Sequence, residues 1–409
     1  MRVATSSFYQ LGLSSMTLQQ GSLLHVQQQL GTGRRILTPS DDPIGATRAL
    51  SVSQAIGVNS QYATSRTQAN TSLALEEKTL QSVITTIQNV QTQIVKAGNG
   101  GLSNEDRASM AAELESNLKQ LVGLANSDDG NGSYLFAGFK SGTPPFIQSN
   151  GGVQYNGDTG TQLLQVDVAR QMAAGDNGRD VFLSVTGSAN YIMTAGAANA
   201  GTATYSALSV SDPTDPLYGH ALEISFATDT VTGEMTYTIT DNSADPVGPI
   251  GTPVPYVDGE AITVAGMTFA IKGKPVDGDT FAVEPAAQAG TDIFANIQSV
   301  VDALKKPVST DADRAALDNA LATANRKMAN SLDNVLTVRA SVGSRMQELD
   351  ALDTIGENRD VSYDQTLSSI QDLDYAAAIT EYYQRQMALQ AAQQSFMQIQ
   401  GLNLFNYMR

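Results

Sequence analysis

Apolar residues recur at helical spacing at both ends of the chain, in stretches that carry almost no charge. Between Val3 and Gly33 there is no Asp, Glu, Lys or Arg, and Gln and Ser fill the polar positions. The last stretch repeats this pattern from Tyr375 onward, interrupted on its apolar face by Arg385. Residues three or four apart share one face of a helix, so each stretch predicts an amphipathic helix.

These two terminal helices are expected to pair with each other as a coiled coil and still leave apolar surface uncovered. A helix pair closes only one seam, and the rest of each apolar face needs another partner. We therefore expect neighbouring subunits to cover it, which predicts a protein built for assembly. The residues predicted to form the assembly interface are Phe8, Leu11, Met16, Leu18, Leu23, Val26, Leu30, Tyr375, Tyr382, Leu389, Phe396, Ile399, Leu402 and Phe405.

Further helices are predicted next to the terminal ones. Asp42 followed by Pro43 is typical of a helix start, and Gly98 is typical of a helix end. Ser103 with Asp106 resembles a capping box that opens the next helix. The apolar positions expected in these two helices are Leu73, Leu80, Val83, Ile87, Val90, Ile94, Ala97, Ala111, Leu114, Leu118, Leu121 and Ala125.

The middle of the chain predicts strands instead. Residues 146–290 contain short alternating segments, such as 222–226, 235–239 and 267–271, between turns rich in Gly, Pro and Asn. Helices are expected to resume at Asp292, and Gly356 is predicted to be a hinge before the last helix.

The expected fold class is therefore α+β with several nested domains. Residues 1–40 and 357–409 would form a terminal helical domain that builds an inner tube. Residues 41–145 and 291–356 would form a helical-bundle rod, and residues 146–290 a β-rich outer domain inserted into it.

Composition narrows the function classes. The net charge is −17, and residues 146–290 hold 16 acidic and 4 basic residues, so this segment carries −12 of it. Nucleic-acid binding needs clustered Lys and Arg, so no nucleic-acid partner is expected. The chain has no cysteine, no signal peptide is predicted, and no apolar run approaches the length of a membrane span.

Catalytic and metal-binding motifs are not predicted. The two histidines, His25 and His220, are far apart in the sequence, and a zinc site built from them is not expected. The run from Asp128 to Gly132 lacks the ligand spacing of a calcium loop, and Asp277 to Asp279 is interpreted as a hairpin turn. We expect no enzyme and no cofactor.

Several blocks of sequence resemble the flagellin superfamily and, within it, the flagellar hook-associated protein 3 family. These blocks are 30–43, with Gly-Thr-Gly-Arg-Arg and Pro-Ser-Asp-Asp-Pro, 132–146, with Tyr-Leu-Phe-Ala-Gly-Phe-Lys, and 391–407 at the end. The resemblance implies a secreted structural adaptor at the hook–filament junction of the bacterial flagellum, exported by the flagellar type III apparatus. The partners that it implies are hook-associated protein 1, flagellin, further copies in a ring layer and an export chaperone.

Two alternatives remain open from the sequence. One is a filament-forming flagellin, which shares the terminal helices. The other is a surface adhesin that uses the acidic β-rich domain, although that domain lacks Trp and its Tyr residues are scattered.

We predict that the stretches 3–33 and 375–409 are largely unfolded in the isolated subunit, because their apolar faces lack cover. Proteinase K is the suitable probe, because the first stretch offers trypsin no Lys or Arg. Brief digestion of purified monomer should remove both stretches and spare the rest of the chain. Resistance of both ends would contradict the prediction.

Overall fold

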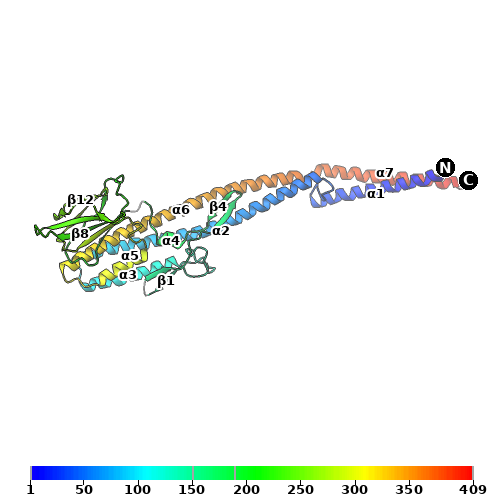
Figure 1. Cartoon of the computed structure of the whole chain (residues 1–409). Coiled ribbons are helices and arrows are strands. Elements are labelled where there is room, and N and C mark those ends of the chain that lie inside the picture. The colour runs from blue at the N-terminus through cyan, green and yellow to red at the C-terminus, as the bar shows by residue number, and fades with distance from the viewer. Residues whose placement is uncertain (1, 150–151, 188–189, 408–409) are drawn as a thin grey trace. The chain divides into compact units, whose positions relative to one another are not determined.

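A computed structural model of the chain describes residues 2–149, 152–187 and 190–407, without the side chains of 2–6, 8 and 399–407 (Figure 1). The chain divides into two compact units. The smaller unit comprises Met1–Thr64 and Ala351–Arg409, and the larger unit comprises Ser65–Asp350. The smaller unit is thus made from both ends of the chain, as a nested architecture requires.

Helices build the smaller unit. They are α1 (Arg2–Thr32), the first part of α2 (Pro43–Ala97), the last part of α6 (Asp311–Gln371) and α7 (Tyr375–Tyr407). The predicted helix start is confirmed, because α2 begins at Pro43 and the Asp42 carboxylate accepts the amide of Gly45 at 2.9 Å.

The hinge predicted at Gly356 is wrong. Helix α6 runs through Gly356 without a break and ends at Gln371. Gly356 is buried, and its carbonyl accepts a hydrogen bond of 2.9 Å from the Asn59 side chain on α2. A glycine in a helix costs only about 1 kcal/mol, and a helix with good packing absorbs that cost. The break before α7 lies instead at residues 372–374.

The rest of α2 and α6 form the helical part of the larger unit with α3 (Asn104–Ala125) and α5 (Ile293–Lys305), and α3 packs on α5. The capping box of Ser103 and Asp106 is confirmed, and Asp292 caps α5. The predicted apolar positions of α2 and α3 are buried. The side chains buried in α5 and α6 include Ile297, Val300, Leu304, Leu321, Met328, Val335 and Val342.

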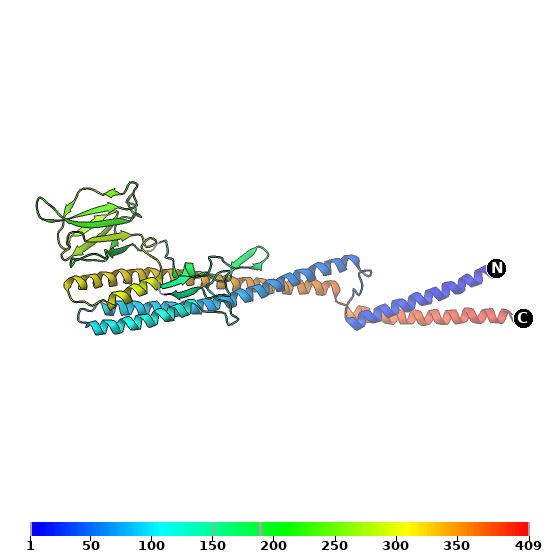
Figure 2. The ribbon, with the colours of Figure 1, turned by 60° about the horizontal axis from the view of Figure 1, so that its bottom comes forward.

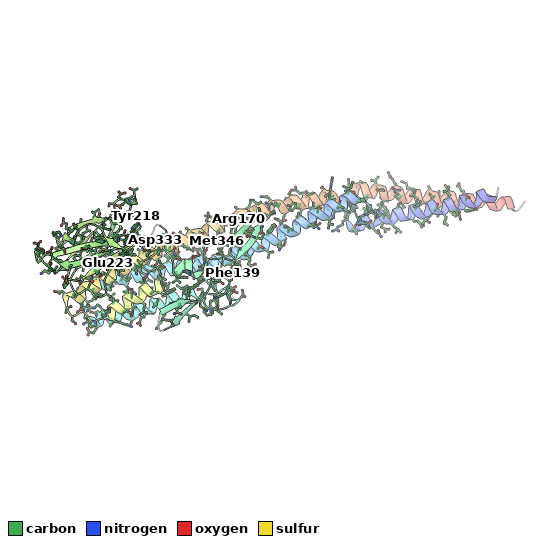
Figure 3. The ribbon with its side chains drawn as sticks, in the orientation of Figure 1. Phe139, Arg170, Tyr218, Glu223, Asp333 and Met346 are labelled. Atoms are coloured by element: carbon green, nitrogen blue, oxygen red, sulfur yellow. The ribbon has the colours of Figure 1, made fainter. Side chains whose placement is uncertain are left out.

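Two hairpins and the short helix α4 (Gly178–Phe182) belong to this part of the unit. The hairpins are β1 (Phe146–Ser149) with β2 (Gly152–Tyr155), and β3 (Leu163–Asp167) with β4 (Arg170–Ala173). Phe146, Phe182 and Phe294 pack ring against ring, with centroids 5.0–5.7 Å apart. Arg170 of β4, labelled in Figure 3, forms an ion pair with Glu348 of α6, which ties the second hairpin to the helix.

The remaining strands form a β-sandwich. One sheet has the order β10-β9-β8-β14-β5 with β11 also on β9, and the other has the order β12-β13-β6 with β7 also on β13. Leu222, Phe226, Phe269 and Phe281 are among the buried side chains of the shared core. The strands are β5 (Ile192–Ala195), β6 (Thr204–Tyr205), β7 (Ser209–Val210), β8 (Leu222–Thr228), β9 (Met235–Asp241), β10 (Gly248–Pro249), β11 (Val254–Pro255), β12 (Ala261–Val264), β13 (Met267–Lys272) and β14 (Thr280–Glu284).

The turn predicted as a hairpin at Asp277 to Asp279 is not one. It connects β13 to β14, which belong to different sheets. The buried Asp279 carboxylate accepts hydrogen bonds from the amides of Ala200 and Gly201. The turn is therefore hydrogen-bonded to the loop that contains these two residues.

The sandwich lies beside α6 (Figure 2), and a row of polar side chains on that helix forms hydrogen bonds with it. The Asn319 amide donates to the Ala203 carbonyl at 2.9 Å, and the Thr323 hydroxyl donates to the Met193 carbonyl at 2.8 Å. Farther along α6, Asn330 donates to the Asn190 carbonyl at 2.9 Å. Asn319, Thr323 and Asn330 are buried, so these bonds satisfy both the helix side chains and the sandwich backbone.

Glu76 of α2 is a buried carboxyl group in the larger unit. Its Oε1 accepts the amide of Asp176 at 3.3 Å, and its Oε2 has no partner among the described residues. Burial raises the pKa of Glu76 well above its usual value, and the negative charge of Asp176 raises it further. Arg345 of α6 opposes this shift and is paired with Asp176.

We predict that Glu76→Gln flattens the pH dependence of stability. Because the folded-state pKa of Glu76 exceeds the unfolded-state pKa, its contribution is fully present below the unfolded pKa near 4.5 and is lost as pH rises through the folded pKa. The loss is about 1.4 kcal/mol per pH unit between the two values. Urea unfolding between pH 5 and 8 would measure it. Glu113→Gln, at an exposed position of α3, is the control for loss of a carboxyl group, and an unchanged slope in Glu76→Gln would contradict the prediction.

Candidate assembly surface

Helices α1 and α7 lie side by side within the smaller unit (Figure 1). Val26 of α1 and Ala378 of α7 are buried at 4% and 5% exposure. Tyr9 and Phe396 meet edge to face with centroids 5.9 Å apart. Gly12 allows this approach, because a Cβ there would lie 3.1 Å from the Phe396 ring. The predicted pairing of the two chain ends is confirmed.

The pairing covers only part of the predicted apolar set. Met16, Leu23, Leu30, Tyr382, Leu389 and Phe396 are half-buried along the seam. Leu11 and Leu18 remain 67% and 72% exposed, and Tyr375 is exposed as well. The side chains of Phe8, Ile399, Leu402 and Phe405 lie outside the described residues. The seam and the exposed apolar face are thus different faces of α1. The helical spacing of Met16, Leu23 and Leu30 separates them from Leu11 and Leu18.

The exposed apolar surface is wider than the sequence analysis predicted. Further exposed side chains line the same helices: Leu13, Leu24, Ile379, Tyr383, Met387 and Met397. A full count of apolar residues around each helix, including those away from the seam, would have found them. Large apolar side chains at this exposure, gathered on one helix pair, are typical of surfaces that bind other proteins.

The chain breaks beside these helices meet and hydrogen-bond to each other. The Arg35 amide donates to the Gln371 carbonyl at 2.7 Å, and the Leu373 amide donates to the Gly33 carbonyl at 3.0 Å. The Arg35 guanidinium also donates twice to the Ile370 carbonyl, at 2.8 and 3.2 Å. We call residues 33–42 together with 370–374 the elbow. The elbow holds the segments 33–42 and 370–374 together at one place. Both terminal helices therefore extend from the rest of the smaller unit together.

One glycine and one aspartate shape the elbow. Gly33 has φ of +69°, and a Cβ there would lie 2.8 Å from the Tyr375 hydroxyl, so this position requires glycine. The Asp41 carboxylate accepts the amides of Thr38 and Leu37 at 2.8 and 3.0 Å. These hydrogen bonds lower the pKa of Asp41, and the bond from Thr38 has the largest effect. His25 of α1 lies 3.2 Å from the same carboxylate.

Features of a catalytic or metal site are sparse. Each histidine has a carboxylate partner, since His25 pairs with Asp41, and His220 lies 2.7 Å from Asp241 in the sandwich. No group of three or more potential metal ligands gathers among the described residues. Within the described residues, we also find no helix with the length and apolar character to cross a membrane.

A pair of terminal helices with exposed apolar faces, in a chain that also has a helical part with an inserted β-sandwich, is typical of subunits that assemble with other proteins. In agreement with this class, residues 3–141 match the family described as bacterial flagellin N-terminal helical region. The chain is 34% identical over 406 residues to the flagellar hook-associated protein 3 of Escherichia coli, with 99% of both chains covered. The chain therefore belongs to the flagellar hook-associated protein 3 family.

Solved structures support this assignment. The crystal structure of Xanthomonas campestris FlgL has a TM-score of 0.68 at 30% identity and covers 78% of this chain and 99% of that one. The flagellar junction protein FlgL of Legionella pneumophila has a TM-score of 0.67 at 25% identity, with 80% and 100% covered.

We predict that Arg35→Ala loosens the elbow. Loss of the bonds to the Ile370 carbonyl should cost about 1 kcal/mol, which speeds local opening roughly fivefold. Hydrogen exchange at the amides of Arg35 and Leu373 in the full-length chain would measure this. Arg34→Ala is the matched control, because the Arg34 side chain is exposed and makes no hydrogen bond among the described residues. Equal exchange rates in the two variants would refute the role of Arg35.

Proposed function

We propose that this chain is a structural adaptor that joins the flagellar hook to the flagellin filament and is required for filament assembly. The main support is its full-length similarity to hook-associated protein 3, together with its similarity to a Legionella pneumophila protein described as a flagellar junction protein. The exposed apolar surface of α1 and α7 supplies the physical means of assembly.

The energetics favour contacts between subunits at this surface. Fully burying one large aliphatic side chain contributes about 1.5–3 kcal/mol. Leu11, Leu18 and Met387, all more than 60% exposed, could each contribute a large part of that amount when a neighbour covers them. Contacts between different faces of identical subunits build rings or helical layers, so one layer of this chain could continue a tube.

We further propose the partners on each side of that layer. Hook-associated protein 1 would lie below, flagellin above, and further copies of this chain beside it. Because the exposed apolar faces would aggregate before assembly, an export chaperone would cover α7, and the flagellar type III apparatus would carry the chain out of the cell. No residue of the chain is assigned a catalytic or cofactor-binding role in this proposal.

Of the alternatives, a filament-forming flagellin remains the nearer one, because flagellins share the N-terminal helical region. The full-length relative favours the adaptor, since this chain matches 99% of its length and it is named as a hook-associated protein. Among the described residues of the sandwich, no feature specifically favours an adhesin.

The test is complementation of a strain that lacks the gene. Without it, electron microscopy should find hooks without filaments, and flagellin should appear in the medium. Wild-type protein should restore filaments, whereas Phe396→Asp should not, because an unpaired charge in the seam costs several kcal/mol. Removal of residues 390–409 should have the same effect and leave the sandwich folded.

Ser395→Asp is the control, since it adds the same charge to α7 at an exposed position on a different face from Phe396 and from the exposed apolar side chains. Long filaments assembled from purified protein without hooks would instead identify a flagellin. Normal swimming by the truncated strain would refute the proposed role of α7.

A further inference from the structure

A cavity of about 320 Å³ lies between the sandwich and the helices of the larger unit. Strand β5 and the loop after it form one wall, and the end of α5 and the first turns of α6 form the other. Helix α6 lines it with small side chains, namely Ala312, Ala316, Ala320 and Ala324. A volume of this size is at the lower end of the range for small-molecule sites in proteins.

Most polar side chains around the cavity already have partners. The Asn199 amide donates to the Thr280 carbonyl at 2.8 Å, and its side-chain oxygen accepts the Thr280 amide at 2.9 Å. The Thr323 hydroxyl donates to Met193, and the Ser299 hydroxyl donates to the Asn296 carbonyl at 2.7 Å. These groups therefore leave little hydrogen-bonding capacity for a ligand.

Lys327 of α6 differs from them. It is half-buried, lines the cavity, and makes no hydrogen bond or ion pair with any described residue. Burial lowers the pKa of Lys327, and the more distant charge of Glu284 opposes that shift. Its Nζ lies beside the Gly290 turn, 3.5 Å from where a Cβ on Gly290 would be. A partly desolvated ammonium that forms no direct ion pair is costly, and an anion in the cavity would offset that cost.

We propose that this cavity binds a small organic carboxylate. The carboxylate would accept a hydrogen bond from Lys327, with the exposed Lys306 at the rim adding positive charge. The Thr194 hydroxyl, which has no side-chain partner among the described residues, can donate a second bond. The hydrocarbon body would contact the alanine methyl groups of α6. This site is independent of the assembly role proposed above.

The probe is sodium hexanoate, titrated into the full-length chain by calorimetry. A ligand of this size with one charge-assisted bond should bind with Kd of about 0.1–1 mM. Hexan-1-ol, which has the same body and no charge, should bind at least about tenfold more weakly. No heat of binding up to about 10 mM hexanoate would overturn the proposal.

Variants separate this cavity from the exposed apolar faces of α1 and α7, which could also take up a fatty acid. Lys327→Met should abolish the binding and raise Tm without ligand, because it removes an unpaired, desolvated charge. Ala320→Leu should block the cavity while Lys327 stays in place. Lys78→Met, at an exposed position of α2, should bind hexanoate as wild type does. Unchanged affinity in Lys327→Met or in Ala320→Leu would overturn the proposal.

Discussion

The pairing of α1 with α7 is the interaction on which the rest of the architecture depends. It brings the two ends of the chain into one unit, so every other element must lie between them in sequence. The same pairing also limits what the helices can bury, because one seam covers Val26, Ala378 and part of Phe396 and leaves Leu11 and Leu18 exposed. The exposed apolar surface is thus a direct consequence of how few neighbours each terminal helix has.

The elbow turns this pairing into a defined geometry. Since Gly33 and Leu373 are hydrogen-bonded to each other, the two chain breaks cannot move independently. Arg35 adds bonds to a carbonyl at the end of α6, where the helix has no further amide to satisfy it.

Within the larger unit, hydrogen bonds from α6 help to hold the insert. Asn319, Thr323 and Asn330 direct their side chains at backbone carbonyls of the sandwich from one helix. Such bonds are directional, so they specify a single orientation of the sandwich on α6, which a smooth apolar face would not. The cavity beside these residues is lined by alanines of α6, whose small side chains leave it unfilled.

The sequence by itself determined the helix boundaries set by local chemistry, the strand-rich middle and the seam residues. The capping groups at Asp42, Ser103 and Asp292 act within a few residues, and the apolar spacing reports directly which side of a helix is covered. Only the tertiary structure decided that α6 continues through Gly356, that residues 277–279 join two sheets, and that Lys327 faces a cavity without a partner among the described residues. Each of these depends on contacts between segments far apart in the chain, and local patterns carry no information about such contacts.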